Sequence, residues 1–331
     1  MGDRAGEIRV ALEAVRAACR ACRAVQRRLA GAALEKADRS PVTVADFAAQ
    51  AIICQRLGAA FPGDAVVGEE GSAALRGNGA AQALIAQVAA FAGAEAPGAD
   101  AASVLDWIDR GGADGGSERY WALDPVDGTK GFLRGEQFAV ALALVEAGEV
   151  VLGVLGCPSL PQGAGEGADS AAAGAGALFS ALRGGGARVH RLWDAADAAG
   201  RAIAVAQTSD PAQARFCESV EAAHSDQEEA ARIAARLGIR RPPLRMDSQC
   251  KYAAVARGDA EIYLRMPTSS AYREKIWDHA AGALLVEEAG GRVTDARGRR
   301  LDFRQGRHLQ QNHGVVATCG ALHEQVLKAI C

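Results

Sequence analysis

The chain has 331 residues, of which 49% are hydrophobic and 23% are charged, and its formal net charge is −3. This length exceeds one typical core, so it predicts two domains or one large layered domain. The absence of a basic block argues against a nucleic-acid partner, and no apolar run is long enough to cross a bilayer.

The N-terminal region predicts an amphipathic helix over residues 8 to 29, because apolar residues recur at intervals of three, four or seven. We interpret the opposite face, which carries most of its arginines, as exposed to solvent; these are Arg9, Arg16, Arg20, Arg23 and Arg27. Charges in the first nine residues interrupt any core of a secretory signal.

The eight cysteines are scattered and indicate reduced thiols in an intracellular protein. We therefore expect a cytoplasmic location, with plastid or mitochondrion as the alternative if a transit peptide has been removed.

A second helix is predicted to begin at Thr43, since Pro41 cannot continue an earlier helix and Asp46 completes a capping box. A carboxylate at this end of a helix tends towards a lower pKa. A short strand over residues 65 to 68 ends in Glu69 and Glu70. The Ala- and Gly-rich stretch from 73 to 103 predicts a helix over 80 to 91 within a mobile insertion.

The middle of the chain predicts a strand over residues 121 to 123 and a hairpin of strands over 138 to 145 and 150 to 155. The low-complexity stretch from 161 to 176 indicates a loop or domain linker.

Strands and helices alternate after this stretch. We expect strands over 202 to 206 and 260 to 265, and helices over 211 to 223, 228 to 237 and 277 to 289, the last ending at Gly290 and Gly291. This pattern predicts an N-terminal α+β domain over residues 1–160, with most candidate metal ligands, and a C-terminal α/β domain over 161–331.

Four carboxylates stand where side chains leave rigid elements. Glu69 follows one strand, Asp124 and Asp127 follow another, and Asp278 opens a helix. Each alone is better explained as part of a turn or as a helix cap. Together they offer the hard oxygen ligands that Mg²⁺ prefers.

The segment Asp124–Phe132 (DPVDGTKGF), with Gly68-Glu69-Glu70 before it and Trp277-Asp278 far downstream, resembles the inositol monophosphatase superfamily. Further segments, among them Ser40–Gln50, Asp247–Tyr252 and Tyr263–Pro267, resemble its bisphosphate nucleotidase branch from yeast and plants. The resemblance implies a layered αβαβα sandwich of the sugar phosphatase type, which combines α/β and α+β features.

The resemblance also implies roles for individual residues. Two or three Mg²⁺ ions would be bound by Glu69, Asp124, the carbonyl of Val126, Asp127 and Asp278. Gly128 and Thr129 would offer N–H groups to the phosphate at a helix start, while Thr129 and Asp46 would orient and deprotonate the attacking water. The nucleotide would contact His224, Ser248, Lys251 and Arg265.

The activity implied is magnesium-dependent, lithium-sensitive hydrolysis of the 3'-phosphate of adenosine 3',5'-bisphosphate, which gives AMP and phosphate in nucleotide and sulfur metabolism. 3'-Phosphoadenosine 5'-phosphosulfate is a further candidate substrate, and a magnesium-activated water would attack phosphorus in line.

An inositol polyphosphate 1-phosphatase is the alternative, although the region from Ser219 to Pro267 favours the nucleotidase. A non-catalytic bisphosphate sensor is disfavoured, because the expected ligands and Thr129 are all present. The expected partner is thus a small nucleotide, with neither nucleic acid nor membrane.

Overall fold

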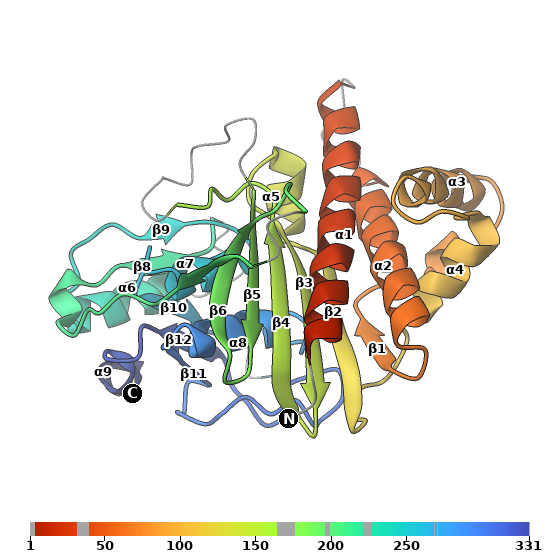
Figure 1. Ribbon diagram of the computed structural model, residues 1–331. Helices are drawn as coiled ribbons and strands as arrows, with labels where there is room; N and C mark the ends of the chain where they lie inside the picture. The colour runs from red at the N-terminus through yellow and green to blue at the C-terminus, as the bar shows by residue number, and fades with distance from the viewer. Residues whose placement is uncertain are drawn as a thin grey trace.

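The computed structural model describes residues 4–31, 40–163, 176–195, 199–220, 227–267, 269 and 271–330. Helices and sheets alternate in layers across the molecule (Figure 1). The helices are α1 (Ala5–Gly31), α2 (Ser40–Ala60), α3 (Ala80–Gly93), α4 (Ala101–Asp109), α5 (Thr129–Arg134), α6 (Gln227–Arg236), α7 (Cys250–Ala256), α8 (Ala280–Glu288) and α9 (His323–Ile330), with short 3₁₀ helices at Ser72–Leu75 and Pro211–Gln213. No helix in these ranges is both long and apolar enough to span a membrane.

Two sheets carry the strands. The seven-stranded sheet has the order β1-β2-β3-β4-β5-β6-β7 and is antiparallel except for the parallel pair β1 and β2. Its strands are β1 (Ala65–Gly68), β2 (Arg119–Asp127), β3 (Ala139–Glu146), β4 (Glu149–Cys157), β5 (Ala177–Leu182), β6 (Gly186–Arg191) and β7 (Arg201–Ile203). The five-stranded sheet has the order β11-β12-β10-β8-β9. Its strands are β8 (Phe216–Glu218), β9 (Leu244–Arg245), β10 (Ile262–Arg265), β11 (Arg292–Thr294) and β12 (Val315–Thr318).

The contacts between elements define five layers. Helices α1 and α2 lie side by side on one face of the seven-stranded sheet (Figure 1), and α7 and α8 cover its other face. The same α7 and α8 contact the five-stranded sheet, beyond which α9 packs on β12 and α6 packs on α9. The predicted αβαβα sandwich is therefore confirmed.

Strand β3 is apolar along most of its length because side chains on both of its faces are buried. Val140, Leu142 and Leu144 point into the core beneath α1 and α2. The alternate residues from Ala139 to Ala143 are alanines and point into the core around α7 and α8. Because both faces of the sheet are covered, successive side chains are buried on opposite sides, and small residues let the second helix layer approach closely.

Most predicted elements are confirmed, but several differ from the structure. Strand β2 runs to Asp127, so Asp124 and Asp127 lie within it rather than after it. Helix α2 begins at Ser40 rather than Thr43, and α8 begins at Ala280 rather than Trp277. The helix expected over 211 to 223 is wrong: a 3₁₀ turn is followed by β8, which pairs with β10 inside the second sheet, so the sheet overrides the local pattern. The insertion from 73 to 103 is structured, because α4 starts there with a capping box between Asp100 and Ser103.

The seven-stranded sheet extends beyond the low-complexity stretch. Residues 164–175 of that stretch lie outside the described part of the chain, but β5, β6 and β7 follow it and complete the first sheet. The second sheet begins at Phe216. A division into domains at residue 160 stays a prediction.

Gly153 on β4 lies directly against α8. A Cβ atom there would lie 2.9 Å from the carbonyl oxygen of Ala281, nearer than such atoms pack. We expect Gly153→Val to lower the free energy of unfolding by about 1–3 kcal/mol through overpacking, although strand propensity alone favours valine. Denaturant unfolding measures this effect. Gly71→Val is the control, since Gly71 is extended and no atom lies within 4 Å of its added Cβ; an equal loss in both variants would contradict close packing as the cause.

His323 is buried between two threonines. Its Nε2 and Nδ1 lie 2.9 Å and 3.0 Å from the hydroxyls of Thr294 and Thr318. The Thr294 hydroxyl already donates to the carbonyl of Asp295, so Nε2–H donates to it, and Nδ1 accepts from Thr318. The ring is thus fully hydrogen-bonded while neutral, and burial lowers its pKa to about 4.

This histidine predicts an acid-sensitive contribution to stability. Unfolded histidine has a pKa of about 6.5, so the unfolded state binds more protons as pH falls from about 6.5 to about 4. The stability that neutral His323 contributes is therefore present above this window and is lost within it. As pH falls through this range, the free energy of unfolding of wild type, measured with denaturant, should approach that of His323→Gln. His313→Gln is the control. A constant difference between wild type and His323→Gln would contradict the assignment.

Candidate active site

A cavity of about 770 Å³ opens where β1 and β2 end. Because the two strands are parallel, with Gly68 opposite Leu123, Glu69 after β1 and the last residues of β2 lie at one edge of the sheet. The cavity brings together ten of the twelve predicted site residues: Glu69, Asp124, Val126, Asp127, Gly128, Thr129, Ser248, Lys251, Arg265 and Asp278.

The end of β2 is irregular, and this irregularity directs two carboxylates into the cavity. In a regular strand, residues three apart point to opposite faces. Here the pairing with β3 shifts register between Asp124 and Asp127, around Pro125. This irregularity lets both carboxylates line the same cavity.

The carboxylates raise one another's pKa values. Burial, together with the charges of Glu70 and Asp127, raises the pKa of Glu69 to about 7. Burial also raises the pKa of Asp278 to about 7, although Arg265 opposes the shift. Burial and the charges of Glu69 and Asp127 hold the pKa of Asp124 well above its usual value. The cavity therefore disfavours the charges that its own residues carry.

A divalent cation fits this set of residues. The side-chain atom Oδ1 of Asp124 is buried and has no hydrogen-bond partner in the described part of the chain. A buried carboxylate oxygen without a partner is costly unless a cation or donor meets it. Hard oxygen donors from Glu69, Asp124, Asp127 and Asp278 suit such an ion.

A second acidic group nearby is less suited to a metal. Potential ligand atoms of Glu274, Asp278 and His279 lie within 4.8 Å of one another. However, Nε2 of His279 lies 3.0 Å from Oε2 of Glu274, and Nε of Arg265 lies 3.1 Å from the same oxygen. Glu274 and His279 are thus already paired, and only Asp278 of this group lines the cavity.

Residues from the second half of the chain pack against the turn at Gly128. Gly128 has a φ of +89°, and a Cβ atom there would lie 2.8 Å from that of Ser248. Ser248 itself has a φ of +66°, unusual for a residue other than glycine. The N–H of Gln249 then donates to Oδ2 of Asp127 at 2.6 Å. The segment that contains Ser248 and Gln249 therefore holds the Asp127 carboxylate in place.

Two of the cations that line the cavity, Lys251 and Arg265, come from the second half of the chain. Lys251, at the start of α7, is 3% exposed; its Nζ donates to the carbonyl of Met246 and lies 5.5 Å from the ring centre of Tyr263. Arg265 ends β10, and its Nη2 lies 3.6 Å from Oδ2 of Asp278. Both positive groups are held by neighbouring residues rather than extended into solvent.

Asp46 differs from its predicted environment. Because α2 begins at Ser40, Asp46 is in the second turn and not at the helix start. Burial, then the charges of Glu70 and Glu69, raise its pKa well above the usual value, so the expected lowering is wrong. Asp46 is not among the residues that line the cavity. His224 lies outside the described residues.

The cavity also contains residues that sequence reasoning did not single out: Lys130, Leu133, Ser219, Asp247, Gln249, Tyr263 and Tyr272. Leu133 and Tyr272 are both 41% exposed, so they form an apolar part of the wall. Ser219, Asp247 and Tyr263 stand in segments that resemble the nucleotidase branch, which was the available signal. Leu133 also stands in such a segment, Gly131–Val140, whereas no such segment contains Tyr272.

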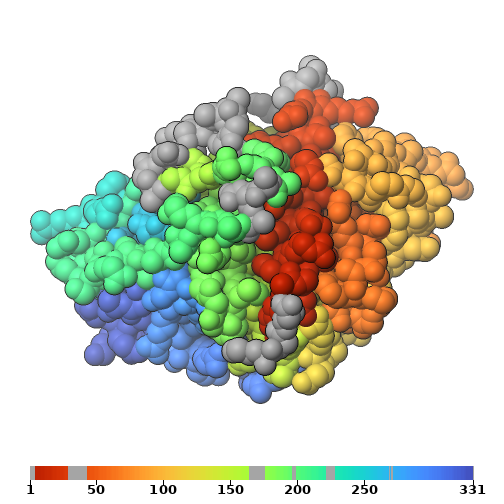
Figure 2. Space-filling model, viewed as in Figure 1, coloured from red at the N-terminus to blue at the C-terminus, as the bar shows by residue number. Residues whose placement is uncertain are grey.

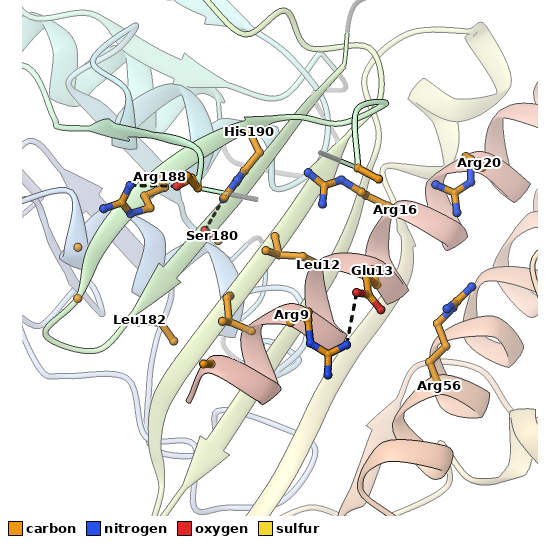
Figure 3. Close-up of a pocket in the computed structure, with 16 residues that line it drawn as sticks. Arg9, Leu12, Glu13, Arg16, Arg20, Arg56, Ser180, Leu182, Arg188 and His190 are labelled. Atoms are coloured by element: carbon orange, nitrogen blue, oxygen red, sulfur yellow. Dashed lines mark hydrogen bonds and ion pairs between the residues drawn. The ribbon is translucent and has the colours of Figure 1, made fainter. Parts of the chain in front are cut away.

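A second cavity, of about 690 Å³, lies between α1 and strands β5 and β6. Arg9, Arg16 and Arg20 from α1 surround it together with Arg188 from β6 (Figure 3). Glu13 is the single carboxylate among the described residues that line it, so it lacks the chemistry of the first cavity.

Arg16 corrects the expectation that the arginines of α1 are exposed. Although α1 forms part of the molecular surface (Figure 2), Arg16 is only 4% exposed, and its Nε donates to the carbonyl of Leu192. The strands beside α1 bury this arginine.

The sequence pattern of the inositol monophosphatase family matches residues 5–331. The chain belongs to this family. The family is metal-dependent, in agreement with the carboxylate cavity.

Among curated proteins, the chain is similar to the 3'(2'),5'-bisphosphate nucleotidase of Emericella nidulans, with 46% identity over 90% of this chain and 89% of that protein. The protein of the same name from Oryza sativa is 44% identical, over 98% of this chain and 94% of that protein. Among solved structures, an inositol monophosphatase from Zymomonas mobilis matches with a TM-score of 0.65 and 21% identity, over 100% of this chain and 99% of that one. This last similarity supports the fold alone.

Because the carboxylates repel one another, removal of one of their charges should stabilise the metal-free protein but weaken metal binding. We expect Asp124→Asn to raise the melting temperature of the metal-free protein at pH 8, because it removes one buried charge from a repelling group. The same variant should lose most of the increase in melting temperature that Mg²⁺ produces in wild type. Thermal unfolding with chelator and with added Mg²⁺ measures both. Asp106→Asn, at an exposed position, is the control; an unchanged Mg²⁺ response in Asp124→Asn would contradict its role as a ligand.

Proposed function

We propose that this chain is a magnesium-dependent 3'(2'),5'-bisphosphate nucleotidase, which removes the 3'-phosphate of adenosine 3',5'-bisphosphate to give AMP and phosphate. The observation that carries the proposal is the division of one cavity into an acidic and a basic part. Glu69, Asp124 and Asp127 lie at the ends of β1 and β2, while Lys251 and Arg265 come from the second half of the chain. This arrangement suits a substrate with two phosphates, one to be hydrolysed and one to be held.

The similarity to the fungal and plant nucleotidases supports the same substrate. The identity extends over nearly the whole chain, including the segments that supply Ser248, Lys251 and Arg265. Since the acidic cavity is suited to phosphate esters in general, these cations are what would select a second phosphate.

The metal would be held by Glu69, Asp124, the carbonyl of Val126, Asp127 and Asp278. Bound magnesium would supply positive charge for the phosphoryl oxygens and would lower the pKa of the attacking water. Gln249 keeps Asp127 in place through its N–H, and Pro125 with the irregular end of β2 directs Asp124 to the same cavity. These contacts fix the carboxylates before substrate arrives, so little reorganisation is needed.

The remaining residues would position the scissile phosphate and move a proton. Gly128 and Thr129 stand where α5 begins, and their N–H groups would donate to the phosphate oxygens. The Thr129 hydroxyl would orient the attacking water, and Asp46 would accept a proton through it. The raised pKa of Asp46 makes it a stronger base than a carboxylate at a helix start.

The substrate is tested by phosphate release from adenosine 3',5'-bisphosphate, adenosine 3'-monophosphate and inositol 1,4-bisphosphate, each with Mg²⁺ and with chelator. We expect the adenosine bisphosphate to have the highest kcat/KM and chelator to abolish turnover. A higher kcat/KM for inositol 1,4-bisphosphate would contradict the proposal and favour an inositol polyphosphate 1-phosphatase.

Lys251→Met tests the basic part of the cavity. Methionine keeps much of the length and the contact with Tyr263 but removes the charge, so we expect the KM for adenosine 3',5'-bisphosphate to rise about tenfold or more. The KM for adenosine 3'-monophosphate, which lacks the second phosphate, should change little. Lys328→Met, at an exposed position of α9, is the control. Equal effects on both substrates would show that Lys251 serves the fold rather than the second phosphate.

A further inference from the structure

A chain of buried hydrogen bonds ends at Arg265, one of the cations of the cavity. The Tyr252 hydroxyl lies 2.7 Å from Nδ1 of His279, and Nε2 of His279 lies 3.0 Å from Oε2 of Glu274. The same Oε2 lies 3.1 Å from Nε of Arg265. Tyr252, His279 and Glu274 are each at most 4% exposed. The support for Arg265 is therefore rigid and excluded from solvent.

The direction of these hydrogen bonds follows from the groups involved. An ionised carboxylate only accepts, so Nε2 of His279 and Nε of Arg265 both donate to Glu274. With Nε2 donating to Glu274, Nδ1 is the ring nitrogen that meets the Tyr252 hydroxyl. The side-chain polar atoms of Tyr252 and His279 thus all have partners, which hold Oε2 of Glu274 in one position. The other oxygen, Oε1, is buried without a hydrogen-bond partner among the described residues.

Two carboxylates compete for Arg265. Glu274 contacts Nε at 3.1 Å, while Asp278, one of the candidate metal ligands, lies 3.6 Å from Nη2. The hydroxyl of Tyr272 is 3.4 Å from the same Nη2. Without Glu274, the arginine would lose its closer carboxylate and would be drawn towards Asp278. An arginine there would compete with a metal for that ligand.

We propose that Glu274 is a positioning residue that keeps Arg265 directed at the second phosphate of the substrate and away from Asp278. His279 and Tyr252 hold Glu274 in place from behind. This inference rests on the proposed function for the identity of the substrate. The part that concerns Asp278 depends only on the binding of a metal. None of these three residues lines the cavity, so they act through Arg265.

Glu274→Gln tests the proposal, because glutamine keeps the shape and removes the charge. We expect the KM for adenosine 3',5'-bisphosphate to rise about tenfold, with little change for adenosine 3'-monophosphate. The Mg²⁺ concentration for half-maximal activity should also rise. Tyr252→Phe, which removes a single hydroxyl, should shift both quantities in the same direction by a smaller factor and serves if Glu274→Gln folds poorly.

A double-mutant comparison separates positioning from general stability. In an Arg265→Met background, Glu274→Gln should add no further change in KM for the bisphosphate, because the group it positions is gone. The matched control is Glu287→Gln, which removes the charge from a Glu–Arg pair on α8, where Glu287 lies 2.6 Å from Arg183. Independent, multiplying effects of the two substitutions, or equal effects on both substrates, would overturn the proposal.

The outcome also distinguishes this inference from the proposed function. If wild type hydrolyses adenosine 3'-monophosphate as efficiently as the bisphosphate, the proposed substrate is wrong. The role of Glu274 as a positioning residue is then still tested by the Mg²⁺ concentration for half-maximal activity. A raised half-maximal concentration in Glu274→Gln supports it, and an unchanged one overturns it.

Discussion

Repulsion among buried carboxylates is the constraint around which this structure is organised. Glu69, Asp124 and Asp278 are held in one cavity, and their raised pKa values show that the protein alone does not stabilise their charges. Such an arrangement is unfavourable for folding and is retained where a cation binds. The fold must therefore supply enough apolar burial elsewhere to hold these groups together.

The layered sheets provide that burial. Alternating residues of β3 enter two separate cores, one beneath α1 and α2 and one around α7 and α8. The central helix layer belongs to both sheets, so the cavity wall from α7 and β10 is fixed relative to the wall from β1 and β2. Close approach of Gly128 to Ser248 joins the two walls at the site itself.

Arg265 links the acidic and basic parts of the cavity. It contacts Glu274 on one side and lies near Asp278 on the other, so its position affects both metal and substrate. His279 and Tyr252, the buried partners of Glu274, do not line the cavity in which metal and substrate would bind. Residues outside the cavity can thus influence the electrostatics within it through one guanidinium group.

The sequence by itself determined the family and the layered fold, because the acidic turn around Asp124 and Asp127 and the distant Asp278 form a specific local pattern. It also named ten of the residues that the structure brings together in one cavity. It also predicted the apolar strands, whose two faces are both buried. Local patterns failed where long-range pairing dominates: β8 replaced a predicted helix by pairing with β10, and Arg16 is buried by strands far along the chain. The raised pKa of Asp46, the wall formed by Leu133 and Tyr272, and the support of Arg265 by Glu274 were likewise decided by tertiary structure. Burial and hydrogen bonding between remote segments set these properties, and neither is encoded in the spacing of neighbouring residues.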